Sequence, residues 1–451
     1  MKTTEHNSQP TANSLLFEDV VMQYEYDIQG NLIYVKDPYD RIVFNYRYNL
    51  QQAALFTNHI DSGISRVIPD ATGKPIEGSD AKDARTLASY DVMQRPVYGW
   101  AQNNSNDNLR MVMYSRYGEE ATNPITNNLL GKPWEQYDEA GKVEMPDYDF
   151  KGNPVTKIRK VISDATLKTE LDNYIPFLID WTNLPDILDG FDYETSNEYD
   201  ALNRVTRLTL PINVDALRNE IIPTYNRAGA LEKVMYDNTE YVTEIAYNAK
   251  GQRLLIAFGN NIMTRYVYDN QSFRLLRQRS EKFTQAQQGN TITYSYENGT
   301  NRQDDEFNYD LVGNILNIIS KVNDCGITGT SDGADKLNRA FTYDPLYRLL
   351  SATGRESDTQ NQNDYLYADA PIPGSPNATN VRAYTRQYNY DKLGNIQKMQ
   401  QTASGNSFTR NFTYNPGVNT LQKVDTGGGS LIQDFTYDAT GNQLTAGSTR
   451  V

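Results

Sequence analysis

A nine-residue pattern recurs along this chain and limits the folds that it can adopt. In residues 307–315, two aromatic residues, Phe307 and Tyr309, are followed by Asp310 and then by Gly313. Aromatic residues two positions apart share one face of a β-strand, because side chains alternate with a period of two. Asp is favoured where a turn begins, and Gly suits the left-handed position of a type I turn with a bulge. The pattern therefore predicts a β-hairpin.

The same pattern returns along most of the chain. The sequence contains twelve Tyr-Asp and five Tyr-Asn pairs, whereas chance predicts about three Tyr-Asp pairs, and such a repeat takes precedence over other arguments about fold. We therefore predict an all-β array of antiparallel hairpins. The residues that we assign to structural repeat turns are Tyr26, Asp27, Gly30, Tyr148, Asp149, Gly152, Tyr309, Asp310, Gly313, Tyr390, Asp391, Gly394, Tyr437, Asp438 and Gly441.

The aromatic residues also suggest how neighbouring hairpins pack. Two residues ahead of the repeat Tyr stands a second aromatic residue, for example Tyr266, Phe307, Phe341, Tyr388 and Phe435. Hairpins lying side by side would place these rings in an aromatic ladder. Because a single hairpin is marginally stable, stability would come from contacts between neighbouring repeats.

The composition agrees with a thin sheet. Hydrophobic residues make up 38 % of the 451 residues even with Tyr included, against roughly 45–50 % apolar residues in an ordinary globular chain. The net charge of −14 argues against nucleic-acid binding, which needs a basic surface. The single Cys325 excludes a disulfide within the chain. We expect neither a membrane span nor a signal peptide.

The repeat signal divides the chain into five parts. We expect a frayed N-terminus (1–19), a first repeat segment with irregular loops (20–160), a short helical insertion (161–195), a regular array (196–447) and a truncated end (448–451). In the insertion, residues 165–174 and 180–188 suit two short helices around Trp181. Residues 58–86 are rich in Gly and Pro, which predicts turns and loop. At residues 90–97 we expect Arg95 and Pro96 to replace the Gly-Asn of the repeat.

Longer blocks of the sequence resemble a known family. Residues 148–153, 199–204 and 343–350 extend the Tyr-Asp pattern. They resemble the YD repeats of rearrangement-hotspot (RHS) proteins, and are similar to the RHS region of the B and C components of insecticidal Tc toxin complexes. The resemblance covers about residues 20 to 447.

The resemblance implies a scaffold. In that family the repeats form a spiralling ribbon, part of a hollow shell that encloses a toxic C-terminal segment, and a core domain after the repeats releases this cargo. No Asp-Pro-x-Gly core motif is present, so we expect the repeat region without protease or toxin. The partners implied are the remaining shell and core domain, the encapsulated toxin segment and other toxin-complex subunits. The implied location is secreted or cell-surface, as part of a larger toxin.

Catalytic and metal sites have weak support. His6 and His59 are the only histidines, and we expect His59 in a loop with no group to orient it. The cluster Asp304–Glu306 could supply a glycosidase pair, but a solvated loop explains it as well. Asp332 and Asp335 lack the ligand spacing of a calcium loop. We therefore predict a non-enzymatic protein without catalytic, cofactor-binding or metal-binding residues.

An alternative function uses the same repeat residues. Exposed Tyr side chains beside carboxylates suit carbohydrate, so the array could be a cell-surface module that binds glycans or proteins. A third interpretation, a glycosidase, would depend on Asp304 or Asp305. Recurrence at one structural position favours a turn role for the Asp and a packing role for the Tyr.

Overall fold

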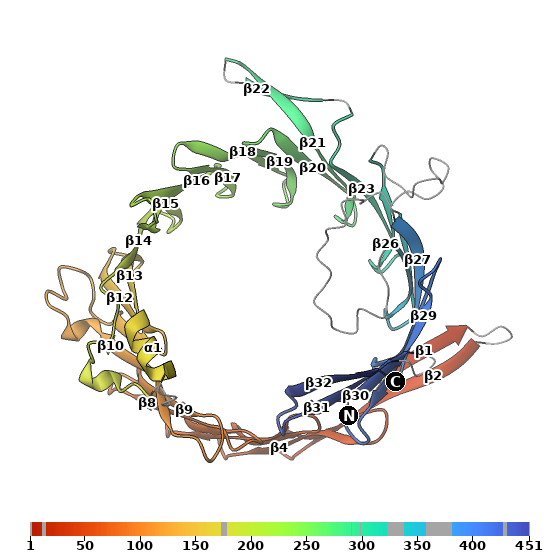
Figure 1. Ribbon diagram of the computed structural model, residues 1–451, viewed down its shortest axis with the longest axis horizontal. Helices are drawn as coiled ribbons and strands as arrows, with labels where there is room; N and C mark the ends of the chain where they lie inside the picture. The colour runs from red at the N-terminus through yellow and green to blue at the C-terminus, as the bar shows by residue number, and fades with distance from the viewer. Residues whose placement is uncertain are drawn as a thin grey trace. The chain divides into compact units, whose positions relative to one another are not determined.

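The computed structural model describes residues 2–10, 15–172, 178–289, 291–297, 299–322, 338–357, 381–426 and 431–450. The chain divides into two compact units. Unit 1 contains residues 1–65 and 263–451, and unit 2 contains residues 66–262. The described residues form antiparallel strands, one α-helix and two short 3-10 helices, so the predicted all-β array with a short helical insertion is confirmed (Figure 1).

Unit 1 is built from consecutive hairpins in two stretches of the chain. Within each stretch, strands pair with strands that are close in sequence, such as β2 with β3 and β27 with β28. Strands β6 (Gly63–Pro69) and β20 (Ile262–Tyr268) lie where the chain passes from one unit to the other. The remaining strands are β1 (Lys2–Pro10), β2 (Leu15–Tyr26), β3 (Leu32–Lys36), β4 (Ile42–Tyr48), β5 (Ala54–His59), β21 (Leu275–Gln288), β22 (Thr291–Tyr296), β23 (Gln303–Tyr309), β24 (Ile315–Ser320), β25 (Arg339–Tyr343), β26 (Leu349–Ser357), β27 (Val381–Tyr390), β28 (Ile396–Ala403), β29 (Phe408–Tyr414), β30 (Leu421–Thr426), β31 (Leu431–Tyr437) and β32 (Gln443–Arg450).

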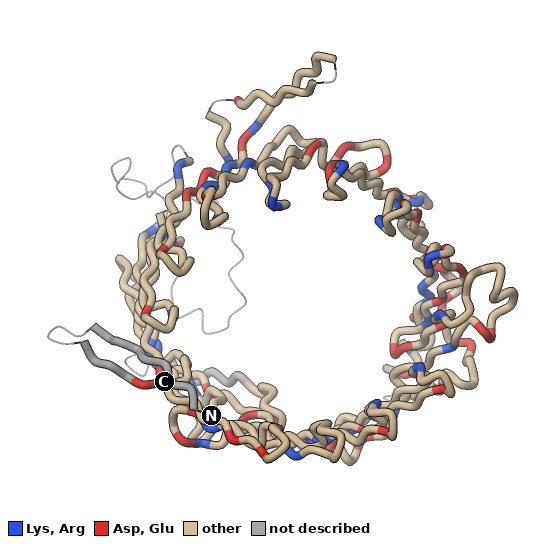
Figure 2. The backbone as a smooth tube through the Cα atoms, turned by 180° about the vertical axis from the view of Figure 1, so that it is seen from behind, with Lys and Arg blue, Asp and Glu red and all other residues tan. Residues whose placement is uncertain are grey.

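Unit 2 continues the same antiparallel pattern with strands that pair in chain order. Its strands are β7 (Pro75–Ser79), β8 (Arg85–Tyr90), β9 (Pro96–Gln102), β10 (Arg110–Tyr117), β11 (Pro133–Asp138), β12 (Gly141–Tyr148), β13 (Pro154–Val161), β14 (Tyr193–Tyr199), β15 (Val205–Ile212), β16 (Arg218–Tyr225), β17 (Leu231–Tyr236), β18 (Thr239–Tyr247) and β19 (Arg253–Phe258). A 3-10 helix, η1 (Gly118–Glu120), follows β10. Acidic and basic residues are both spread along the backbone of each unit (Figure 2).

The hairpins share one irregularity of register. In the pairing of β2 with β3, Glu25 faces Tyr34 but Tyr26 faces Leu32, so one residue is skipped beside the turn. The same shift precedes Tyr90, Tyr309, Tyr390 and Tyr437. A type I turn followed by a bulge produces this shift, and it adds twist to the hairpin.

Two segments differ from their predictions. Residues Lys2–Pro10 pair along their whole length with residues 15–23, although the sequence led us to expect a disordered or frayed N-terminus over 1–19. Residues 58–86, expected to be loop, contain β6 and β7. Pro69 ends β6 and Pro75 begins β7, where a proline removes no ladder hydrogen bond, and Gly73 lies in the turn between them with φ +90°. Prolines and glycines here mark the ends of short strands.

The insertion packs on the sheet through one aromatic residue. It contains α1 (Asp164–Asp172) and a 3-10 helix, η2 (Trp181–Asn183), in place of the longer second helix expected over 180–188. That helix stops because Leu184 adopts a left-handed φ of 46° and Pro185 follows. Trp181 is fully buried against Met111 and Tyr137.

Strands β13 and β14 pair with each other across the insertion, so the hairpin array continues on both sides of it. The domain boundaries expected at residues 160 and 196 stay predictions.

Stacked rings lie mainly in unit 2. Tyr98, Tyr114 and Tyr137 stack successively with centroid distances of 5.1 and 5.6 Å, and Tyr137 contacts Trp181 at 5.1 Å. This stack runs across strands β9, β10 and β11, but it contains none of the residues for which the ladder was expected. The ladder of Tyr266, Phe307, Phe341, Tyr388 and Phe435 stays a prediction. The features discussed at Cys325, Asp332 and Asp335 lie outside the described residues.

Candidate functional site: the repeat turns and their tyrosine links

The Asp of each repeat is the centre of its turn. In the first hairpin, Oδ1 of Asp27 accepts hydrogen bonds from the backbone N–H groups of Gln29 and Asn31, both at 2.8 Å. Its Oδ2 accepts a third from the Asn31 side-chain amide at 2.8 Å. The backbone N–H of Asp27 donates to the Asn31 carbonyl, and Gly30, at φ +85°, donates to the Asp27 carbonyl. One carboxylate therefore closes a five-residue loop.

The other turns assigned from the sequence have the same geometry. Asp149, Asp310, Asp391 and Asp438 each accept from the backbone N–H and the side-chain amide of the Asn four residues later. The glycines between them, Gly152, Gly313, Gly394 and Gly441, have φ values between +79° and +115°. A side chain is strained in that region, which explains why the repeat carries glycine there.

Some repeats use arginine in place of the asparagine. In the Asp200 turn the Nε of Arg204 donates to Oδ2 of Asp200 at 2.7 Å, and Asn203 occupies the left-handed position at φ +62°. At Asp91 the left-handed residue is Gln94, with φ +64°, and Arg95 binds the carboxylate. The expectation that Arg95 and Pro96 replace Gly-Asn was therefore wrong by one position.

Hydrogen bonding changes the acidity of these carboxyl groups. The side-chain and backbone hydrogen bonds from Asn31 lower the pKa of Asp27 below its usual value. The same cause lowers the pKa of Asp149. At Asp310, burial raises the pKa, but the hydrogen bonds from Asn314 and Gly313 outweigh it and the net shift is downward. These groups are ionised turn elements, and a general acid at neutral pH needs the opposite shift.

Eleven tyrosines of the described residues, each just before a turn, link their hairpin to an earlier one. Their hydroxyl groups donate to the carbonyl of the residue that begins an earlier returning strand, at 2.6–3.0 Å. The links are Tyr48–Leu32, Tyr90–Pro75, Tyr117–Pro96, Tyr148–Pro133, Tyr199–Pro154, Tyr225–Val205, Tyr247–Leu231, Tyr309–Leu275, Tyr343–Ile315, Tyr390–Leu349 and Tyr414–Ile396. Burial raises the pKa of the Tyr148 hydroxyl to about 12, so it stays a donor.

The sequence contains a signal for these links. The position before the turn is Tyr in every one of these repeats, whereas the residue two positions earlier varies, as at Ala88, Ile245, Phe307 and Tyr388. A ring alone would serve for packing, so the requirement for Tyr indicates a hydroxyl that makes a hydrogen bond.

The acidic cluster considered for catalysis is engaged in an ion pair. Both carboxylate oxygens of Asp304 accept from Arg277, each at 2.7 Å, and the Asp304 side chain is 2 % exposed. Asp305 accepts from Gln303 at 2.8 Å. His59 ends β5, not a loop, and packs against Phe44, and its Nδ1 accepts from the backbone N–H groups of Asp61 and Ser62.

Within the described residues, no group of three or more His, Cys, Asp or Glu side chains converges as metal ligands would. None of the described helices has the length and apolar character needed to cross a bilayer.

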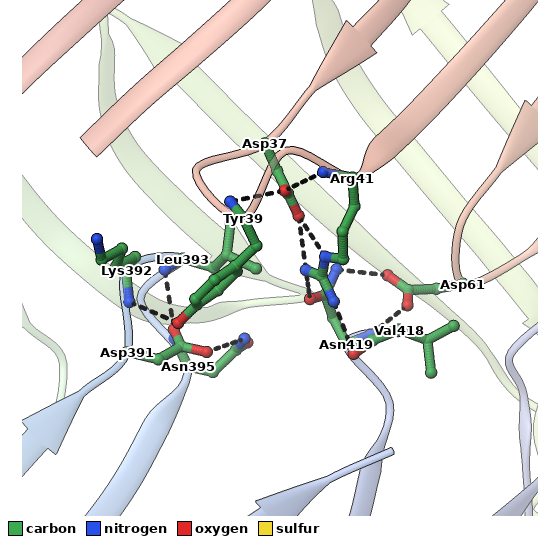
Figure 3. Close-up of polar contacts among 10 residues, drawn as sticks. All are labelled: Asp37, Tyr39, Arg41, Asp61, Asp391, Lys392, Leu393, Asn395, Val418 and Asn419. Carbon is green, nitrogen blue, oxygen red and sulfur yellow. Dashed lines mark hydrogen bonds and ion pairs between the residues drawn. The ribbon is translucent and has the colours of Figure 1, made fainter. Parts of the chain in front are cut away.

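A second polar site joins the two stretches of unit 1. Arg41 binds Asp37 in its own turn at 2.6 Å and donates to the Asn419 side chain at 2.8 Å (Figure 3). The Asn419 backbone and side-chain N–H groups donate to the two carboxylate oxygens of Asp61, at 2.6 and 3.1 Å. Tyr39 points toward the 391–395 turn, where its hydroxyl accepts from the backbone N–H of Lys392 at 3.4 Å.

Comparison with known proteins gives related toxin subunits. No family model matches the chain. Toxin subunit YenC2 of Yersinia entomophaga is 26 % identical over 427 residues, which cover 88 % of this chain and 42 % of that protein. Toxin subunit YenC1 of the same organism is 26 % identical over 415 residues, covering 89 % of this chain and 40 % of that protein. The chain thus spans about two-fifths of the length of these relatives.

Solved structures share the fold. A Tc holotoxin pore from Photorhabdus luminescens matches with a TM-score of 0.79 and 23 % identity, over 98 % of this chain and 20 % of that chain. A crystal structure of TcdB2–TccC3 matches with a TM-score of 0.78 and 21 % identity, over 98 % of this chain and 22 % of that chain. The resemblance to Tc toxin components is confirmed: the chain is homologous to the toxin subunits YenC2 and YenC1, and has the fold of part of the TcdB2–TccC3 structure.

Proposed function

We propose that this chain is a non-catalytic RHS-repeat scaffold, a segment of a shell that encapsulates a toxic C-terminal cargo in a Tc-type complex or a related polymorphic toxin. The observation that carries the proposal is the use of the repeat side chains. Tyr hydroxyls bind carbonyls of neighbouring hairpins, and Asp carboxylates bind their own turns. The repeated groups hold the array together and are not arranged around a ligand.

The relatives support the toxin context of the proposal. Both curated relatives are named as toxin subunits, and the matched structures contain TcdB2 and TccC3. We infer that the partners of this chain are the remainder of an RHS shell with its core domain, the enclosed toxin segment and other toxin-complex subunits. The corresponding location is secreted or cell-surface, within a larger toxin.

The contacts of the acidic residues favour a scaffold over an enzyme. A glycosidase needs one carboxyl group that is protonated near neutral pH and a second that is ionised. Asp304 is ion-paired at both oxygens with Arg277. A glycan-binding module that used the linking tyrosines as hydrogen-bond donors would need their hydroxyl protons, but these are donated to backbone carbonyls.

Electron microscopy of the complete natural protein tests the proposal. A hollow particle whose wall contains these repeats, with cargo density inside, is the expected result. A solid globule would contradict it. A glycan array probed with the same protein serves as the comparison for the alternative, because reproducible binding that mutation of exposed tyrosines abolishes would favour a recognition module.

A further inference from the structure

We propose that Asp37, Arg41, Asp61 and Asn419 form a polar latch, which holds the first repeat turns of unit 1 against the last ones and opens while both stretches remain folded. Arg41 is the bridging residue: it binds Asp37 beside it and reaches Asn419 across the contact. The two residues are 378 positions apart in the sequence. Figure 3 shows their side chains converging from separate strand pairs.

In the latch, turns of the first stretch of unit 1 alternate with turns of the second stretch. The sequence spacing between two such turns is the same in both stretches. Asp37 and Asp61 are 24 residues apart, and so are Asp391 and Asn415, the residues that begin two late turns. The turn at Asp37 contacts both late turns, through Tyr39 to Lys392 and through Arg41 to Asn419.

The second early turn continues this alternation. Asp61 meets Asn419 on one side. On its other side, a Cβ added to Gly441 would lie 2.9 Å from the Asp61 carbonyl oxygen. Equal spacing therefore allows the two rows of turns to fit between one another.

The chemistry of the contact allows reversible opening. The groups that meet are a guanidinium, two carboxylates, an amide and backbone N–H and C=O groups, including the Val418 carbonyl. Water can replace each of these hydrogen bonds when the contact separates. The strand pairs within each stretch, such as β3–β4 and β29–β30, keep their own hydrogen bonds. Separation of the turns therefore does not require either stretch to unfold.

The position of Asp61 is set by its own stretch. The His59 ring at the end of β5 accepts from the Asp61 and Ser62 backbone N–H groups at 3.3 and 3.2 Å. The Asp37 side chain is 1 % exposed and fixes the Arg41 guanidinium through Nε at 2.8 Å. Both early turns therefore present their polar groups to Asn419 already oriented, which reduces the entropy lost when the latch closes.

Amide hydrogen exchange of the whole chain tests the latch. In Arg41→Gln and in Asp61→Ala we expect exchange of the Asn419 amide to rise at least about tenfold, because its acceptor is displaced or lost. The matched control is Arg204→Gln. Arg204 binds Asp200 through Nε at 2.7 Å as Arg41 binds Asp37, but its contacts lie in its own and the adjacent repeat. In this control the Asn419 amide should keep its protection.

A glycine pair provides a second, independent variant. Gly441→Ala places a Cβ against the Asp61 carbonyl, whereas Gly251→Ala, at the same φ of +79°, meets no atom within 4 Å. Both changes strain their own turn, but only the first should speed exchange across residues 37–41 and 415–420.

Unchanged Asn419 protection in all three latch variants, or equal loss in Arg204→Gln, would overturn the proposal. Protection of the Asn31 amide, which binds Asp27, reports that the fold is intact. Any use of the latch to admit or release cargo rests on the proposed function, but the exchange experiment does not. The latch could be confirmed in a protein that forms no hollow particle, and a hollow particle could form without the latch.

Discussion

At the scale of residues, one carboxylate and one hydroxyl explain why the pattern recurs. Asp149 organises its own turn, and Tyr148 beside it reaches the carbonyl of Pro133 at 2.6 Å. The two neighbouring residues thus do different work: the first shapes a hairpin and the second joins it to another. Neither residue requires a ligand to explain its presence.

The turn aspartates predict a specific response to acid. Because the pKa values of Asp27, Asp149 and Asp310 are lowered in the folded protein, their contribution to stability is complete above the unfolded pKa and is lost as pH falls through the folded pKa. A variant with Asn at all three positions should therefore lose less thermal stability between about pH 6 and pH 3 than the natural chain. The ordinary pKa of an Asp carboxyl group, about 3.9, lies within this range. Calorimetry across that range measures the difference.

The chain contains its own control for this experiment. The side-chain oxygen of Asn248 accepts from the Lys250 and Gln252 backbone N–H groups, as an Asp carboxylate does in the other turns. The Asn248 side-chain amide donates to the Gln252 side chain. Asn is therefore compatible with the turn. An acid response that is identical in the natural and substituted chains would contradict a role for these three aspartates.

The hydrogen bond made by a linking tyrosine makes a measurable contribution to the free energy of unfolding. Tyr148→Phe leaves the ring in place but removes the donor to the partly buried Pro133 carbonyl, which should cost about 1–2 kcal/mol of unfolding free energy. The same change at Tyr26, which is 43 % exposed in the first hairpin, should cost less than about 0.5 kcal/mol. Urea denaturation compares them, and equal losses at both positions would disprove the link.

At the scale of elements, the hairpin and the insertion have different sources of stability. Prolines begin several returning strands, for example Pro75, Pro96 and Pro154, beside the bulge where the ladder needs no donor. Their carbonyls then accept the tyrosine hydroxyls. The insertion depends instead on burial, because Trp181 is fully buried and its indole N–H donates to the Asp138 carbonyl at 3.1 Å.

Removal of that side chain should detach the insertion from the sheet. Trp181→Ala is expected to cost about 3–5 kcal/mol locally, because it leaves a cavity beside Met111 and Tyr137. The observable is faster proteolysis within residues 163–188, with the hairpins on either side still folded. Leu178→Ala, at a side chain that is 49 % exposed in the same insertion, is the control and should change little. Equal cleavage rates in both variants would contradict the packing argument.

At the scale of the whole molecule, stability should be a sum over neighbouring repeats. Each tyrosine link joins a hairpin to a nearby one, as Tyr225 does with Val205 and Tyr414 with Ile396. In such an array, distant repeats affect one another only through the repeats between them. The latch is the exception, because it joins residues at the two ends of the numbering.

Additivity follows for links in different units. Tyr148→Phe in unit 2 and Tyr343→Phe in unit 1 should give a double variant whose loss of unfolding free energy equals the sum of the single losses within about 0.5 kcal/mol. A double-mutant cycle from denaturant titrations measures this. A coupling energy above about 1 kcal/mol would show that the units fold as one cooperative body.

The sequence by itself determined the hairpins, because their contacts are local. The Asp carboxylate binds groups two and four residues further along the chain, and glycine is needed three residues after the Asp. The turn and its hydrogen bonds can therefore be inferred from the amino-acid sequence alone. The error at residues 58–86 arose where Pro69 stands in place of the repeat Tyr, although Asp70 and Gly73 keep the regular offsets, and the error at Gln94 arose where another residue occupies the glycine position. Only the tertiary structure decided which carbonyl each Tyr meets, what covers Trp181 and that Arg41 meets Asn419. Those contacts depend on how small twists add up over many repeats, and no short stretch of sequence encodes that sum.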